Sequence, residues 1–183
     1  MDQRRNFRQS HQRIQEPSEF FEKVVQVNRV SKKTPGGDKR SLSVLVVVGD
    51  KKGRVGVGLG KAGDVQSAVR KATTYAKKHF IDVPLKDNRT IPHEIFVKLG
   101  AAKILMKPCP EGTGVIAGGA VRVVMEACGI RDVVSKILGT SNRASNVYAT
   151  LEALKRLQQV RDRRTNKPDK NSNEKKSKTK GAK

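Results

Sequence analysis

The stretch Arg54-Val55-Gly56-Val57-Gly58-Leu59-Gly60 alternates strictly between larger residues and glycine. Side chains in a strand point alternately to opposite faces, so this segment predicts a β-strand with one aliphatic face and one bare face. A bare face allows another backbone to approach closely, because no Cβ atoms stand in the way. We interpret the glycines as lying on the outer face of an edge strand, just before a helix begins.

Two further strands precede this segment. Residues 23–34 mix valines with polar residues, and residues 41–48 change from an alternating pattern to a wholly apolar one. Pro35-Gly36-Gly37-Asp38 separates these two strands, and Asp50-Lys51-Lys52-Gly53 follows the second. Turn-forming residues at this spacing predict hairpins, and therefore a three-stranded antiparallel meander.

A helix is predicted after the glycine-rich strand, because apolar residues recur there at the spacing of one helical stripe. The members of the stripe are Val65, Ala68, Val69, Ala72, Ala76 and Phe80. Such a stripe needs a sheet to cover, and the meander supplies one. The first module is therefore β-β-β-α over residues 18–83, preceded by a basic N-terminal extension at residues 1–17.

A second module, β-β-α-β-α, is predicted over residues 84–160, which makes the chain α+β. Its strands are expected at residues 94–99, 103–107 and 132–138, with a turn-rich segment at 108–119. A short helix carries an apolar stripe formed by Val121, Val124, Met125 and Cys128, and Gly129 follows it at the C-cap position. The last helix, residues 142–160, should bury Ala144, Val147, Tyr148, Leu151, Leu154 and Leu157. Residues 161–183 contain no Val, Ile, Leu or aromatic residue and are expected to be disordered.

The charge of the chain indicates a polyanionic partner. Lys and Arg number 39 against 17 Asp and Glu, which gives a formal net charge of +22. A strongly basic folded body with basic ends favours nucleic acid. Aromatic residues make up only 4% of the chain. This counts against stacking of bases on aromatic platforms and favours contact with phosphate, ribose and RNA shape.

Other classes of protein fit the composition poorly. Cys109 and Cys128 are too few for a secreted disulfide scaffold and too far apart for a CxxC zinc site. No apolar run approaches the length of a membrane span, and no hydrophobic signal region follows the start. We therefore expect a cytoplasmic protein with no membrane partner.

One motif favours an enzyme. Gly58-Leu59-Gly60-Lys61-Ala62-Gly63 matches GxGxxG, and Asp82 follows after about 20 residues, as in a dinucleotide-binding fingerprint. However, that fingerprint belongs to a parallel βαβ unit, whereas the strands here are predicted to be antiparallel. A Rossmann-type oxidoreductase is therefore the less favoured alternative.

The remaining motifs give no catalytic constellation. Glu111-Gly112-Thr113-Gly114 precedes a helix and could form an anion nest, a tight connector or a protein contact, but it lacks the end of a phosphate loop. The three histidines have no spacing that suggests a metal site or a nucleophile–base pair. We expect no enzymatic activity, no cofactor, no metal and no small-molecule substrate.

Basic residues of the first module gather at the two hairpin turns and at the junction between strand and helix. Loops on a rigid sheet can straddle phosphates across a groove. We therefore expect these residues to bind RNA: Arg29, Lys32, Lys33, Lys39, Arg40, Lys51, Lys52, Arg54 and Lys61.

Several stretches of the chain resemble the bacterial small-subunit ribosomal protein five family, uS5. They include Val27-Asn28-Arg29-Val30-Ser31-Lys32, Gly53-Arg54-Val55-Gly56-Val57-Gly58-Leu59-Gly60-Lys61-Ala62 and Glu111-Gly112-Thr113-Gly114-Val115-Ile116-Ala117-Gly118-Gly119-Ala120-Val121-Arg122. The resemblance covers about residues 18–160 and keeps the order and spacing of the motifs. It implies an N-terminal module similar to a double-stranded-RNA-binding fold and a C-terminal module with a split β-α-β arrangement.

The resemblance also implies function. The first hairpin loop of the family inserts into ribosomal RNA, which adds Ser31, Gly36 and Gly37 to the expected RNA-binding residues. The glycine-rich turn, with Gly112 and Gly114, and Arg122 of the following helix correspond to a contact with ribosomal protein four that is linked to decoding accuracy. Ribosomal protein eight and messenger RNA, at the channel through which it enters the subunit, are further expected partners. A free-standing double-stranded-RNA-binding protein remains the other alternative.

Overall fold

The computed structural model describes residues 20–165, with side chains described as far as Leu157. The first sheet contains β1 (Phe21–Thr34), β2 (Gly37–Gly49), β3 (Arg54–Ala62) and β4 (Ile81–Asp82), in that order, and every neighbouring pair is antiparallel. Helix α1 (Val65–Lys78) follows β3. The predicted meander and helix are confirmed, whereas the two-residue strand β4 was not predicted.

The second sheet has the order β5-β6-β8-β7. Its strands are β5 (Ile95–Leu99), β6 (Ala102–Pro108), β7 (Val115–Ile116) and β8 (Val133–Ile137), and its helices are α2 (Gly119–Cys128) and α3 (Arg143–Thr165). Strand β6 is antiparallel to both β5 and β8, so these two run parallel with β6 between them, which is a split arrangement. The α+β class is confirmed.

Two details of the second module differ from the prediction. Strand β7, which pairs in parallel with β8, lies inside the segment that was expected to form only turns. Helix α3 ends at Thr165 rather than at residue 160. The N-terminal extension and the rest of the basic tail lie outside the described residues.

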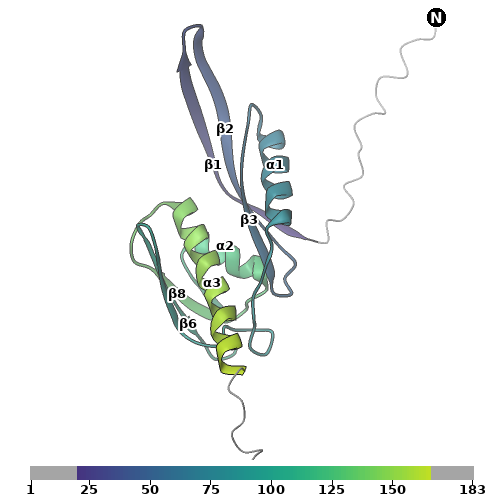
Figure 1. Cartoon of the computed structure of the whole chain (residues 1–183), viewed down its shortest axis with the longest axis vertical. Helices are drawn as coiled ribbons and strands as arrows, with labels where there is room; N and C mark the ends of the chain where they lie inside the picture. The colour runs from purple at the N-terminus through teal and green to yellow at the C-terminus, as the bar shows by residue number, and fades with distance from the viewer. Residues whose placement is uncertain (1–19, 166–183) are drawn as a thin grey trace, which may run out of the picture.

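Strand β2 is buried on both faces. Val44, Val46 and Val48 pack against α1, while Leu45 and Val47 belong to a larger core that contains residues of the second module. This explains why the end of the strand is wholly apolar. The second module therefore covers the Val47 end of the face that α1 leaves free, while Leu59 on the same face stays exposed (Figure 1).

The glycines of β3 lie on the face covered by α1, so the interpretation that they occupy an outer face is wrong. A Cβ atom at Gly56, Gly58 or Gly60 would overlap the backbone of the helix. The close approach of another backbone is thus confirmed. Most of the predicted helical stripes are buried, but Val65 and Tyr148 are exposed because they lie at the margins of their helices' packed faces.

The turn between β2 and β3 packs on the end of α2. The Lys51 N–H donates to the Ala127 carbonyl at 3.0 Å, and the Gly53 N–H donates to the Cys128 carbonyl at 2.9 Å. Gly129 ends the helix with a φ of 90°, as predicted for a C-cap, and a side chain there would overlap the Lys51 carbonyl. The two modules are thus joined by backbone hydrogen bonds as well as by a shared core.

Candidate nucleic-acid interface

The β1–β2 hairpin projects beyond α1 and beyond both cores (Figure 1). Every residue from 31 to 40 is exposed. At the tip, Gly37 adopts a φ of 118°, and the Thr34 hydroxyl donates to the Gly37 carbonyl at 2.6 Å. The turn chemistry read from the sequence therefore produces a long two-stranded arm with its backbone fixed at the tip.

The two faces of this arm carry different charged residues. Lys32 lies directly opposite Lys39, whereas Ser31 lies opposite Arg40 on the other face, together with Arg29. Lys33 forms an ion pair with Asp38, with Nζ–Oδ1 at 3.0 Å. Like charges directly opposite one another destabilise a hairpin. The Lys32–Lys39 pair therefore indicates a surface that is suited to an anionic partner.

Lys61 lies at the base of the arm. It is exposed near the end of β3 and pairs in register with Ser43 of β2. The structure thus gathers one group of the expected RNA-binding residues at one end of the first sheet. This arm group consists of Arg29, Ser31, Lys32, Lys33, Gly36, Gly37, Lys39, Arg40 and Lys61.

Lys51, Lys52 and Arg54 lie at the opposite end of β2, and we call them the turn group. At about 3.3 Å per residue, Arg40 lies about 30 Å from the turn along β2, and Lys61 lies about 23 Å from Arg54 along β3. The expected basic residues therefore form two surfaces and do not surround one groove.

Two members of the turn group have partners within the protein. Arg54 Nε lies 2.7 Å from Asp50 Oδ2, and Lys51 Nζ lies 4.6 Å from the centre of the Phe21 ring. Burial alone would raise the pKa of Asp50. The bond from the Arg54 side chain and the backbone N–H groups of Arg54 and Lys52 together outweigh burial, and they lower the pKa below its ordinary value. The turn is therefore well fixed, and its charge is partly neutralised.

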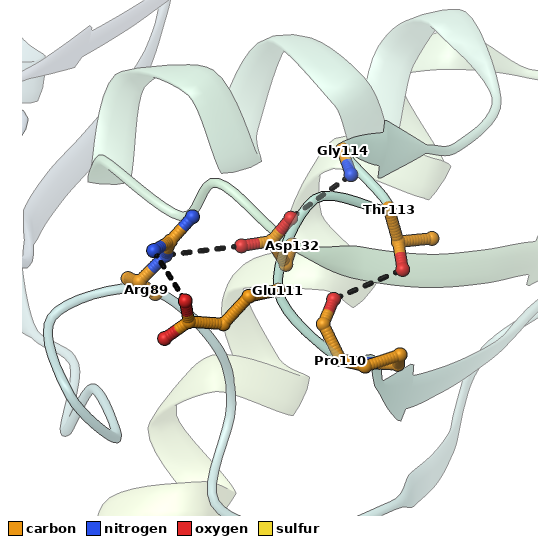
Figure 2. Close-up of polar contacts among 6 residues, drawn as sticks. All are labelled: Arg89, Pro110, Glu111, Thr113, Gly114 and Asp132. Carbon is orange, nitrogen blue, oxygen red and sulfur yellow. Dashed lines mark hydrogen bonds and ion pairs between the residues drawn. The ribbon is translucent and has the colours of Figure 1, made fainter.

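The glycine-rich loop before α2 is held by a buried carboxylate (Figure 2). The Gly114 N–H donates to Asp132 Oδ1 at 2.9 Å, and Arg89 Nε donates to Asp132 Oδ2 at 3.3 Å. Arg89 also reaches Glu111, with Nη1–Oε2 at 2.9 Å. The Gly114 N–H first, and then the Arg89 guanidinium, lower the pKa of Asp132. Since Asp132 already accepts from this N–H, the loop is better described as a rigid connector than as an anion nest.

Sequence reasoning missed Arg89 and Asp132. Both lie far from Gly114 along the chain, in connections without a regular pattern. The sequence offers one local hint of a tight loop, which is the glycine at positions 112 and 114. In the structure these residues adopt positive φ angles of 87° and 75°, a conformation that favours glycine.

Arg122 belongs to a different polar network. Its Nε lies 2.8 Å from Glu126 Oε1, and Lys23 Nζ of β1 lies 3.1 Å from Glu126 Oε2. The bond from Arg122, followed by that from Lys23, lowers the pKa of Glu126 against the opposing effect of burial. Arg122 is exposed, and none of its ion pairs joins it to the loop at Gly112 and Gly114.

The geometry does not favour a dinucleotide site at Gly58–Gly63. The sheet there is antiparallel, and α1 occupies the glycine face. Among residues 20–165, no group of His, Cys, Asp and Glu is placed to hold a metal ion. Over the same part of the chain, no helix combines the length and the apolar character needed to span a membrane.

Comparison with known proteins identifies the family. Residues 20–84 match the model described as "Ribosomal protein S5, N-terminal domain", and residues 97–167 match the corresponding C-terminal domain. The chain belongs to the ribosomal protein S5 family.

Similar proteins share about half of their residues with this S5 family member. The chain is 48% identical over 161 residues to small ribosomal subunit protein uS5 of Ruegeria sp. strain TM1040, covering 88% of this chain and 86% of the relative. It is 49% identical to uS5 of Thermosynechococcus vestitus, covering 83% and 87%. It is 50% identical to uS5c of Cyanophora paradoxa, covering 76% and 82%. Since this is a structural, non-enzymatic family, the oxidoreductase alternative is wrong.

Proposed function

We propose that this protein is a structural component of the small ribosomal subunit and binds ribosomal RNA. Family membership supports this function, as does the formal net charge of +22. A net charge of this size destabilises the compact state through self-repulsion, and a bound anion relieves that repulsion. The phosphates of ribosomal RNA would supply the negative charge.

The observation that carries the RNA contact is the Lys32–Lys39 pair on the projecting arm. No acidic side chain within the described residues pairs with either lysine, and the two lie directly opposite one another. The arm group would bind phosphates by releasing counterions, while the fixed shape of the arm would set its position on the RNA. The turn group is a second and separate RNA contact, with Lys52 as its most available charge.

The finer partners follow from the resemblance to the family. Gly112, Gly114 and Arg122 would contact ribosomal protein four and thereby support decoding accuracy. The rigid loop and the exposed guanidinium of Arg122 suit such a contact, because little side-chain or backbone freedom would be lost. Contacts with ribosomal protein eight, and with messenger RNA at the channel where it enters the subunit, complete the proposal.

The test compares two variants that lose the same charge. In one, Lys32, Lys39 and Arg40 are replaced by Ala; in the other, Lys71, Lys78 and Lys155, which are exposed on helices, are replaced by Ala. Binding is measured to small-subunit ribosomal RNA and to a generic RNA duplex over a series of salt concentrations. We expect the arm variant to bind more weakly and to reduce the salt slope by about two to three, while the helix variant changes little.

The same titrations separate the alternatives. If the two variants lost RNA affinity equally, the arm would not be the site of RNA binding. Equal affinity of the unmodified protein for ribosomal RNA and for the generic duplex would favour the free-standing double-stranded-RNA-binding protein instead.

A further inference from the structure

A groove lies where β1 of the first module meets the second module, and we call it the junction groove. Residues of β1 line it together with the start of α2, the loop after β8 and the start of α3. Its volume is about 690 Å³, which lies in the range of pockets that hold small molecules. No member of the arm group or of the turn group lines it. The groove is therefore separate from the expected RNA contacts.

One part of the junction groove is aliphatic. The pairing of β1 with β2 shifts in register between Val24 and Gln26, which is a β-bulge. Neighbouring strand residues normally point to opposite faces, but the bulge allows Val24 and Val25 both to line the groove. Ile137 and Leu138 line it from the second module. Val24 is 45% exposed and Leu138 is 54% exposed, so this wall offers apolar surface to a branched aliphatic group.

Another part of the groove suits an anion. No side chain caps the start of α2, where Gly119 and Ala120 line the groove, so the first N–H groups of the helix are available to a ligand. The Arg143 side chain lines the groove too, and its Nη1 donates to the Val25 carbonyl at 3.4 Å. A guanidinium has five N–H donors, so others remain for a ligand. None of the described residues that line the groove is acidic, and its charge therefore favours a carboxylate.

Asn146 is an independent sign of a ligand. It lines the junction groove and is only 2% exposed. Its Nδ2 donates to the Thr140 carbonyl at 2.8 Å, which fixes the orientation of the amide. Its Oδ1 accepts no hydrogen bond from any described residue. A buried acceptor without a partner costs free energy, and a ligand that donates to it would recover that cost.

We propose that the junction groove binds a small aliphatic α-amino acid or α-hydroxy acid. The carboxylate would accept hydrogen bonds from the start of α2 and from Arg143. The ammonium or hydroxyl group beside it would donate to Asn146 Oδ1, and the branched side chain would pack against the aliphatic wall. The inference does not rest on the proposed function, because the arm group and the turn group take no part in this site.

The backbone of RNA fits the junction groove less well. A ribose phosphate also combines an anion with hydroxyl donors, but it has no aliphatic group to cover Val24, Ile137 and Leu138. Among the described residues that line the groove there is no aromatic side chain on which a base could stack. The combination of an anion site, one orphaned acceptor and an aliphatic wall therefore favours the small acid.

The test is a titration of the isotope-labelled full chain followed by NMR, with ligands that each lack one group. L-leucine carries all three groups, leucinamide lacks the carboxylate, isocaproate lacks the donor, and glycine lacks the aliphatic side chain. We expect leucine to shift the backbone signals of Gly119 and Ala120 and the side-chain amide signal of Asn146. Each of the other three ligands should bind about tenfold more weakly or worse. Leucic acid, with a hydroxyl in place of the ammonium, should bind at the same residues, and the tighter of the two identifies the donor.

Two variants test the groove from the side of the protein. Gly119→Leu fills it, and the chain should fold because a Cβ atom at this position meets nothing within 4 Å. Gly63→Leu is the matched control, at another position where a Cβ atom meets nothing within 4 Å. Arg143→Gln removes an exposed guanidinium, as does its control Arg70→Gln on α1. We expect Gly119→Leu to abolish the leucine shifts and Arg143→Gln to weaken leucine binding about tenfold, while both controls bind like the unmodified protein.

Four results would overturn the proposal. Unchanged signals of Gly119 and Asn146 up to the solubility limit of leucine would show that the groove takes no such ligand. Equal affinity for leucine and isocaproate would show that Asn146 Oδ1 needs no donor from a ligand. Tighter binding of ribose phosphate than of leucine at the same residues would assign the groove to the RNA backbone. Equal loss of binding in Gly119→Leu and Gly63→Leu would place the leucine site outside the groove.

Discussion

Gly58 of β3 lies so close to Ala72 of α1 that a Cβ atom at position 58 would overlap the Ala72 carbonyl oxygen. Gly56 stands in the same relation to Ala76, and Gly60 to Ala68. Two residues of a strand advance about 6.6 Å and four residues of a helix about 6.0 Å, so the two repeats nearly coincide. Glycine at every second strand position and alanine at every fourth helix position therefore allow strand and helix to lie in backbone contact.

Replacing Gly58 with Ala should destabilise the protein by roughly 2–4 kcal/mol, because the added methyl group must push the helix backbone away from the sheet. Gly63→Ala is the matched control, since a Cβ atom there meets nothing within 4 Å. Its effect should stay within about 0.5 kcal/mol. Urea unfolding followed by circular dichroism measures both, and equal midpoints would contradict the close contact.

The arm should be more stable without its like-charged pair. Replacing Lys32 and Lys39 with Ala is expected to raise the free energy of unfolding by roughly 0.2–1 kcal/mol in low salt, with a smaller gain as salt screens the repulsion. The same change should weaken RNA binding. Lys33→Ala provides the contrast, because it removes the ion pair with Asp38 and should slightly lower stability. A loss of stability in the double variant would show that the two lysines do not repel.

The shared core predicts that both modules unfold together. The chain has two tyrosines and no tryptophan, so Tyr75→Phe leaves Tyr148 as the fluorescent reporter of the second module, and Tyr148→Phe leaves Tyr75 for the first. Both tyrosines are exposed, so neither change should disturb packing. Urea titrations of the two variants should give coincident midpoints. Separate midpoints would mean that the apolar contacts between the modules contribute little.

Asp132 should contribute stability that depends on pH. Its pKa is lowered in the folded protein, so its contribution is complete above the pKa of the unfolded chain and is lost as the pH falls through the lower folded value. Asp132→Asn should therefore lower the urea midpoint at pH 7, and the difference from the unmodified protein should shrink as the pH falls below about 4. Glu94→Gln, which removes an exposed carboxylate, should change the urea midpoint at pH 7 only slightly. If the urea midpoint of Asp132→Asn were lower than that of the unmodified protein by the same amount at every pH, the charge of Asp132 would not be what stabilises the loop.

Local patterns in the sequence were enough to predict the main elements, because alternation and helical spacing directly reflect which faces are buried. The glycine-rich strand shows the limit of prediction from local patterns. A period of two reveals that the strand has two different faces, but it cannot tell which face the helix covers, since that depends on contacts between distant segments. Strands β4 and β7 are two residues long, and so they carry no period at all.

The candidate site divides in the same way. The arm could be predicted because Pro35, Gly36 and Gly37 give a local turn signal between two strands. The separation of the arm group from the turn group follows from the length of β2, which joins them. The Arg89–Asp132–Gly114 contacts join three distant segments of the chain, so no local pattern could reveal them.

Strand β2 is both the second half of the projecting arm and the central strand of the packed sheet, which gives the arm the mechanics of a lever fixed at its base. From residue 43 to the tip, the arm extends about 20 Å beyond the buried segment. A tilt of only 5° at the base, such as a cavity at Val47 could produce, would displace the tip by about 2 Å, which is enough to break hydrogen bonds to RNA. Substitutions deep in the core, far from any basic side chain, can therefore misdirect the arm while leaving its charge intact.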